Sequence, residues 1–108
     1  MVLICLLPYE TPKEQGIVAE AWDYLSRRFP RAELSLSEER GLNLERSVRE
    51  DTPVHYRDAY FEVSSADPRD DASCLEEQAK LLDFLNERYA ALGLPLVSEQ
   101  RLECYPLR

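Results

Sequence analysis

Val2 to Leu7 form an uninterrupted apolar run that Pro8 ends, and few structures can accommodate a run of this kind. It fits a β-strand covered on both faces, because neither row of alternating side chains then meets water. It is far shorter than the roughly 20 apolar residues that cross a bilayer, and it lacks the basic start of a signal sequence. We therefore expect a strand in the interior of a sheet, and neither a membrane anchor nor a signal sequence.

Two later segments place apolar residues at spacings of three and four, the period of a helix with one buried face. The first, about residues 12–29, begins at the capping-box sequence TPKE at 11–14 and stops at Pro30, which cannot continue a helix. The second follows the capping residue Ser73 and ends at Gly93. The expected buried faces are Ile17, Val18, Ala21, Trp22, Leu25 and Phe29 in the first helix, and Leu75, Ala79, Leu82, Leu85, Tyr89 and Leu92 in the second.

Between and after these helices the apolar residues alternate with polar ones, which is the period of a strand with one buried face. The alternation runs over residues 34–48, with Gly41 as an expected bulge or turn. It resumes over 58–63 after the turn-forming residues 49–53, so the two segments predict an antiparallel hairpin. A last, shorter strand is expected at 101–105.

These elements predict an α+β protein with βαββαβ order, the ferredoxin-like arrangement, in which two helices cover one face of an antiparallel sheet. Residues 1–108 fit a single compact domain. The parity of the strand residues then separates a helix-facing side from a bare side. The expected inner residues are Leu34, Leu36, Leu42, Leu44, Ala59, Phe61, Val63, Leu102 and Cys104. The expected outer residues are Glu33, Ser35, Asn43, Glu45, Asp58, Tyr60, Glu62, Arg101, Glu103 and Tyr105.

Sequence motifs for catalysis or cofactor binding are missing. The chain has one histidine, His55, three cysteines without a CxxC pair, and three glycines. Zinc-ligand spacing, a Ser-His-Asp arrangement and a phosphate-cradling glycine loop are therefore not evident. His55 follows the predicted hairpin turn, where a polar residue commonly aligns the strand ends. We expect no catalytic residue, no metal and no cofactor, and hence no enzyme.

The net charge of the chain limits the classes of molecule that it is expected to bind. With 21 acidic and 13 basic residues it carries a formal charge of -8, which repels the phosphates of nucleic acids and of anionic membranes and attracts basic proteins. Three cysteines in apolar segments, an odd number, indicate reduced thiols and a cytoplasmic location.

The charge and the lack of catalytic motifs favour a small acidic protein-binding module, an inhibitor of a basic partner such as an immunity or phage counter-defence protein. Its expected contact surface is the bare sheet face, with Asp58, Tyr60 and Glu62 at the centre and Glu33, Glu45, Glu103 and Tyr105 around them. The alternative is a small-molecule-binding protein or cofactor-free enzyme of the dimeric α+β barrel type. In that case a pocket between sheet and helices would use His55, Tyr60 or Glu62 as acid or base.

The oligomeric state stays open between a monomer and a homodimer. Half of the expected outer residues are carboxylates, which oppose a homodimer formed face to face unless Arg101 or ordered water neutralises them. A third possibility is that the acidic charge serves only solubility.

Overall fold

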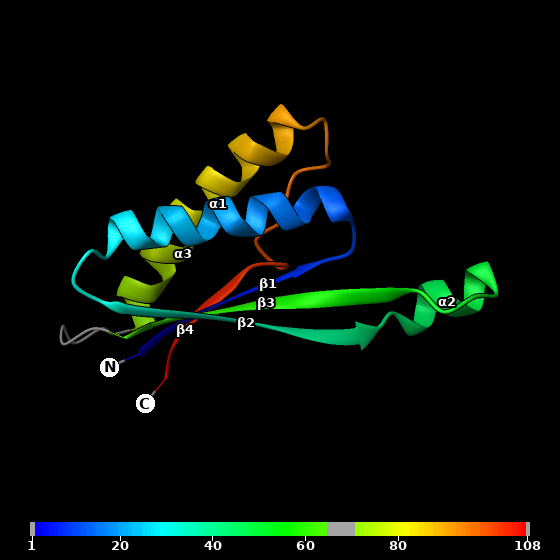
Figure 1. Ribbon diagram of the computed structural model, residues 1–108, viewed down its shortest axis with the longest axis horizontal. Helices are drawn as coiled ribbons and strands as arrows, with labels where there is room; N and C mark the ends of the chain where they lie inside the picture. The colour runs from blue at the N-terminus through cyan, green and yellow to red at the C-terminus, as the bar shows by residue number, and fades with distance from the viewer. Residues whose placement is uncertain (1, 65–70, 108) are drawn as a thin grey trace.

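The computed structural model describes residues 2–64 and 71–107. The elements are β1 (Val2–Tyr9), α1 (Pro12–Arg28), β2 (Glu33–Leu42), α2 (Leu44–Glu50), β3 (His55–Ser64), α3 (Asp71–Ala91) and β4 (Glu103–Leu107). The strands form one sheet in the order β2-β3-β1-β4, and every neighbouring pair is antiparallel. Helices α1 and α3 lie on one face of this sheet (Figure 1). The apolar run is therefore an interior strand, as predicted.

The predicted βαββαβ, ferredoxin-like arrangement is wrong, because a third helix separates β2 from β3. The sequence over 42–48 alternates like a strand, but Asn43 caps a helix there by accepting a hydrogen bond from the Arg46 backbone N–H at 3.1 Å. Asp51 ends the helix in the left-handed conformation, with φ of 51°. The fold class is α+β with an antiparallel sheet, and its connection between β2 and β3 is helical.

Helix α2 is stabilised by the hydrogen bonds at its ends and not by packing against the core. Leu44 is 69% exposed and Val48 is 82% exposed, so neither gains the burial that a core strand would give. The Ser47 hydroxyl instead donates to the Asn43 carbonyl at 2.6 Å and accepts from the Val54 backbone N–H at 2.8 Å. These bonds tie the helix to the chain that enters β3.

Gly41 lies inside β2 and makes neither a bulge nor a turn, so that prediction is wrong. The register of β2 with β3 is unbroken from Glu33 opposite Ser64 to Leu42 opposite His55, and Gly41 faces Tyr56. A Cβ on Gly41 would stand 2.3 Å from Cζ of the Tyr56 ring. The glycine therefore allows the ring to lie against the backbone of β2.

The core lies between the sheet and the two long helices. The predicted inner residues of β3, together with Leu102 and Cys104, are buried. In β2, Leu34 is only half-buried, while Leu36 and Leu42 are 37% and 43% exposed. Strand β2 is an edge strand, and its last residues run past the end of β1, where only β3 pairs with them. At that end of β2, the side chains on the helix-facing side of the sheet are not covered by a helix among the described residues (Figure 1).

Helix packing follows the predicted faces with some exceptions. Trp22 is half-buried against the core that contains Phe61 and Leu82, whereas Leu75 and Leu92 are exposed. Helix α3 begins at Asp71, so Ser73 lies within it and does not cap it. Residues 65–70, between the end of β3 and the start of α3, lie outside the described residues.

The three cysteines are buried, and none of them forms a disulfide. Cys5 and Cys104 are register partners on β1 and β4, and the Cys104 Sγ donates to the Cys5 Sγ at 2.6 Å. This hydrogen bond, followed by burial, raises the pKa of the Cys5 thiol well above its usual range. The Cys5 thiol is therefore neutral, and both cysteines are part of the core.

Candidate functional site

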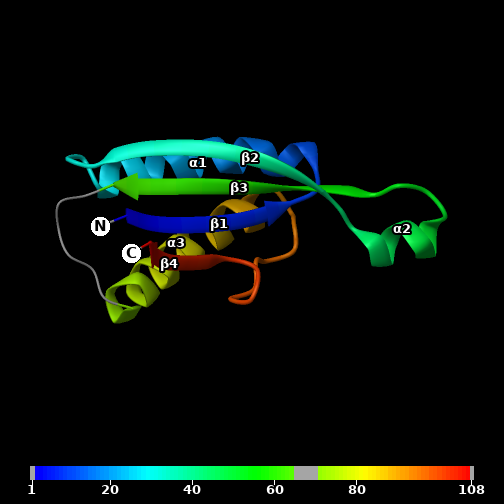
Figure 2. The same ribbon diagram turned by 90° about the horizontal axis from the view of Figure 1, so that it is seen from below.

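The sheet face turned away from α1 and α3, here called the outer face, carries the residues predicted to bind a partner. Figure 2 looks onto it: the strands lie in front of α1 and α3, and no described helix crosses before them. Residues paired across an antiparallel register share a face, so the pairs Ile4 with Glu62 and Ile4 with Tyr105 define it. Its carboxylates are those of Glu33, Glu39, Asp58, Glu62 and Glu103.

The structure brings six of the seven predicted contact residues onto this face. They are Glu33, Asp58, Tyr60, Glu62, Glu103 and Tyr105. Glu45 is not among them, because it lies in the first turn of α2. Glu39 was missed, although it continues the parity of Glu33 along β2 and stands directly opposite Asp58. The pKa of Asp58 is raised by burial first and then by the charge of Glu39.

An apolar strip runs through the middle of the outer face. It is formed by the outward residues of β1, of which Ile4 has no exposed surface and Leu6 is half-buried. Their register partners include Tyr60 and Tyr105, one on each side of β1. Desolvation raises the pKa of the Tyr60 hydroxyl, and Tyr105 raises it further through its charge and a hydrogen bond. The tyrosines thus meet over the strip.

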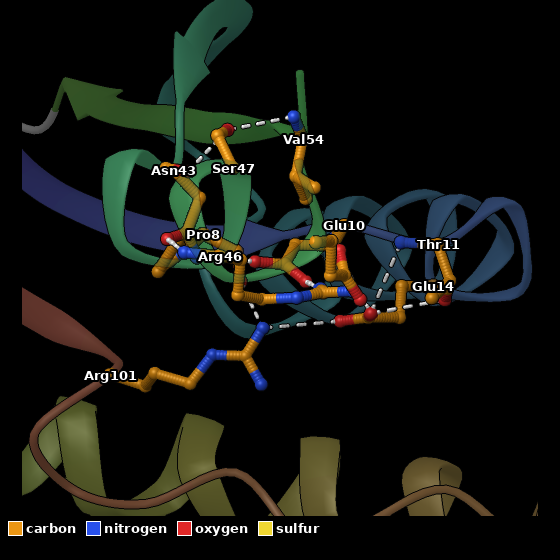
Figure 3. A network of polar contacts seen from close by, with 10 residues as sticks. Pro8, Glu10, Thr11, Glu14, Asn43, Arg46, Ser47, Val54 and Arg101 are labelled. Carbon is orange, nitrogen blue, oxygen red and sulfur yellow. Dashed lines mark hydrogen bonds and ion pairs between the residues drawn. The ribbon is translucent and has the colours of Figure 1, made fainter. Parts of the chain in front are cut away.

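The outer face carries no basic side chain at the strand positions that the structure describes there. Arg101 was expected to point outward, where it could have neutralised carboxylates in a homodimer. Its Nη2 instead donates to the Pro8 carbonyl at 2.8 Å and lies 3.4 Å from the Glu14 Oε2 (Figure 3). Arg57 follows the opposite parity to Asp58, so it also belongs to the other side. The described strand positions of the face therefore combine acidic, aromatic and apolar groups with serines, and none of them is cationic.

A second feature is a cavity of about 700 Å³ where β1 ends and α1 begins. Its lining residues are Pro8, Tyr9, Glu10, Thr11, Glu14, Leu42, Asn43, Leu44, Tyr56, Tyr89, Leu94, Pro95 and Arg101. The alternative function placed a pocket between the sheet and the helices, whereas this cavity lies at the end of the sheet. Its volume is in the range that holds small organic molecules.

Glu14 is the buried charge of this cavity and was predicted only as a helix cap. It makes the capping box, with its Oε1 3.0 Å from the Thr11 hydroxyl, and its Oε2 accepts from the Tyr89 hydroxyl at 2.6 Å. Burial by itself would raise its pKa. The hydrogen bonds from Tyr89, Thr11 and the Glu10 backbone, together with the charge of Arg101, outweigh burial and lower the pKa. Glu14 is thus held as a carboxylate.

The three residues named for the alternative function as possible acid or base do not share one side of the sheet. His55 is the exposed first residue of β3, and its parity places it opposite to Tyr60 and Glu62. Among the described residues there is no group of three histidine, cysteine or acidic side chains that could hold a metal ion. Within the same residues, no helix is both long and apolar enough to span a bilayer.

Comparison with protein families, with curated proteins and with solved structures finds no match to this chain.

Proposed function

We propose that the protein is a binding module that attaches to a basic protein through its outer face and thereby blocks that partner. The observation that carries the proposal is the composition of the face: carboxylates and tyrosines around an apolar strip, with no cationic side chain at its described strand positions. A partner rich in arginine or lysine complements it in charge.

The carboxylates give the face its long-range attraction. Glu39 and Asp58 stand opposite each other, so like charges are neighbours there, and Glu62 lies four residues further along β3 on the same face. Such an arrangement costs stability in the free protein, and a cationic partner relieves the cost. Complementary fields also raise association rates by about 10 to 1,000-fold. Salt screens them over about 8 to 10 Å, so binding should weaken as salt is added.

Tyr60 and Tyr105 supply the short-range part of the interface. Rigid aromatic side chains that meet over an apolar strip are typical of the residues that carry binding energy, since they lose little side-chain entropy. Tyr105 is 38% exposed, so a partner can still cover it. Charge thus accelerates encounter, and the tyrosines hold the complex.

A second copy of this chain is a poor occupant of the same face. A two-fold contact would place the carboxylates of both copies together, and no arginine of the outer face would neutralise them. A basic protein avoids this repulsion. Covering the basic surface of a toxin or of a defence protein would inhibit it, which is the immunity or counter-defence form of the proposal.

The test begins with a photo-crosslinking residue at Ser37, which is exposed on β2 and is the register partner of Tyr60. The same residue at Lys80, exposed on α3, is the positional control. We expect Ser37 to capture a basic protein from host extract and Lys80 not to capture it. Binding to the purified partner is then measured at several salt concentrations.

Charge reversal decides whether the outer face is the interface. Asp58→Lys with Glu62→Lys should abolish binding, and the matched pair Asp23→Lys with Glu87→Lys, exposed on the helices, should leave it nearly unchanged. Both double variants alter the net charge equally. Equal affinities and equal salt dependence in the two variants would mean that the acids serve solubility, and the proposal would fail.

A further inference from the structure

A second, smaller hollow of about 210 Å³ lies beside the cavity, and its walls are basic. Arg40 comes from β2 and His55 and Arg57 from β3, while Tyr9, Glu10, Thr11, Pro12, Gln15 and Tyr56 complete the lining. We call it the basic hollow. Arg40, His55 and Arg57 follow the parity opposite to the outer face, so the two features are independent of each other.

The placement of the two arginines is unfavourable without an anion. Arg40 and Arg57 are direct register partners, and like charges opposite each other destabilise a strand pair. Glu38 lies 3.7 Å from the Arg57 Nη1, but it also accepts a hydrogen bond from the Tyr9 hydroxyl. The side chains of Arg40 and His55 have no hydrogen bond or ion pair among the described residues.

The hollow adjoins the larger cavity, because both are lined by Tyr9, Glu10, Thr11 and Tyr56. The one carboxylate among these shared residues, that of Glu10, is occupied by Arg46 and by the Asn43 side chain (Figure 3). Glu10 is therefore not available to the two arginines, and of these only Arg57 has an ion pair among the described residues, with Glu38. On the cavity side, Leu42, Leu44 and Leu94 provide apolar wall.

We propose that the basic hollow binds the phosphate group of a small organic phosphate monoester whose apolar part occupies the adjoining cavity. Paired guanidinium groups bind phosphate oxygens through charge-assisted, bidentate hydrogen bonds. A phosphate monoester carries about 1.5 to 2 negative charges at neutral pH, which matches two arginines better than a single carboxylate does. The apolar wall selects an ester with an aromatic or aliphatic body over free phosphate.

Phenyl phosphate is the probe, followed by backbone amide chemical shifts of the full chain. We expect saturable binding, with shifts at Tyr9, Thr11 and His55. Inorganic phosphate, which lacks the apolar body, and benzoate, which carries one charge, should each bind at least about fivefold more weakly. If benzoate binds as tightly, the ligand class is wrong. If inorganic phosphate binds as tightly, the cavity takes no part.

Variants separate a built site from general attraction to cations. Arg40→Gln should weaken phenyl phosphate binding about tenfold or more, because it removes charge-assisted bonds. Arg49→Gln makes the same change at an exposed residue of α2 that lines neither the basic hollow nor the cavity, and it should leave the affinity for phenyl phosphate unchanged.

Melting temperatures of both variants, measured alongside, establish that the fold survives, and His55→Gln is a second variant expected to weaken binding. The proposal is overturned by equal affinities in Arg40→Gln and Arg49→Gln. It is equally overturned if no saturable shift appears in the parent protein up to about 10 mM phenyl phosphate.

Discussion

Replacing Tyr89 with phenylalanine tests the buried contact that joins α1 to α3. The change deletes only the hydroxyl that donates to Glu14 at 2.6 Å, and both side chains are buried, Tyr89 to 1% exposure and Glu14 to 6%. Hydrogen bonds to charged groups contribute about 1.5 to 3 kcal/mol to stability. We expect the lower end of this range at pH 7, since Glu14 lines the cavity and water can take the place of the hydroxyl.

The pH dependence provides the sharper criterion. The folded-state pKa of Glu14 is lowered, so its contribution to stability is present above the pKa of an unfolded glutamate, about 4.3, and is lost as pH falls through the lower folded value. The deficit of Tyr89→Phe should therefore be full at pH 7 and should shrink below about pH 4.

Urea unfolding at several pH values measures this deficit, with a fall in Tm of about 6 to 12 °C as an independent readout at pH 7. Tyr24→Phe is the matched control, because Tyr24 stacks on Phe84 with ring centroids 4.7 Å apart and its hydroxyl has no hydrogen bond among the described residues. A deficit below about 0.5 kcal/mol, or one that is the same at about pH 3 as at pH 7, would refute the role given to this bond.

Three further changes test the fold. Phe61→Ala, at a side chain 1% exposed, should cost about 3 to 5 kcal/mol in denaturant melts, and a cost below about 1 kcal/mol would contradict its place in the core. Gly41→Ala should destabilise by about 1 to 3 kcal/mol because the new methyl meets the Tyr56 ring. Adding Tyr56→Ala should recover most of that loss, and a purely additive result would argue against the contact. Asn43→Ala should weaken α2 by about 1 kcal/mol, seen as faster amide exchange at Arg46 with little change in overall Tm.

Much of the architecture is readable from local patterns. The apolar run of β1 fits only an interior strand of a sheet, and β1 is one. The capping box at Thr11 starts α1 where expected. The alternation over 59–63 correctly identifies the buried side of β3. Periodicity predicts these segments correctly because the free energy gained by burying one face is larger than the intrinsic conformational preferences of the residues. The acidic outer face follows from the same parity, apart from Glu45.

The misreadings come from places where burial is weak. The alternation of Leu42 and Leu44 indicated a strand, but those residues have no core to enter, and the Asn43 cap was enough to make α2 helical. Gly41 was interpreted as a break in the strand. The reason for a glycine there is the ring of Tyr56, which lies on another strand, so the local sequence around Gly41 does not reveal it. In both cases the free energies of the alternative backbone conformations differ by only about 1 kcal/mol. A short sequence pattern cannot decide between conformations that differ so little.

The cavity and the basic hollow depend on contacts between distant parts of the chain. Tyr89 reaches Glu14 across 75 positions, and Arg101 turns to Glu14 instead of to the outer face. Arg40 and Arg57 become neighbours only when the register of β2 with β3 is set. Periodicity assigns each of these residues to one face of its own element, but which groups meet depends on strand register and helix placement, because charges and hydrogen bonds act over a few ångströms.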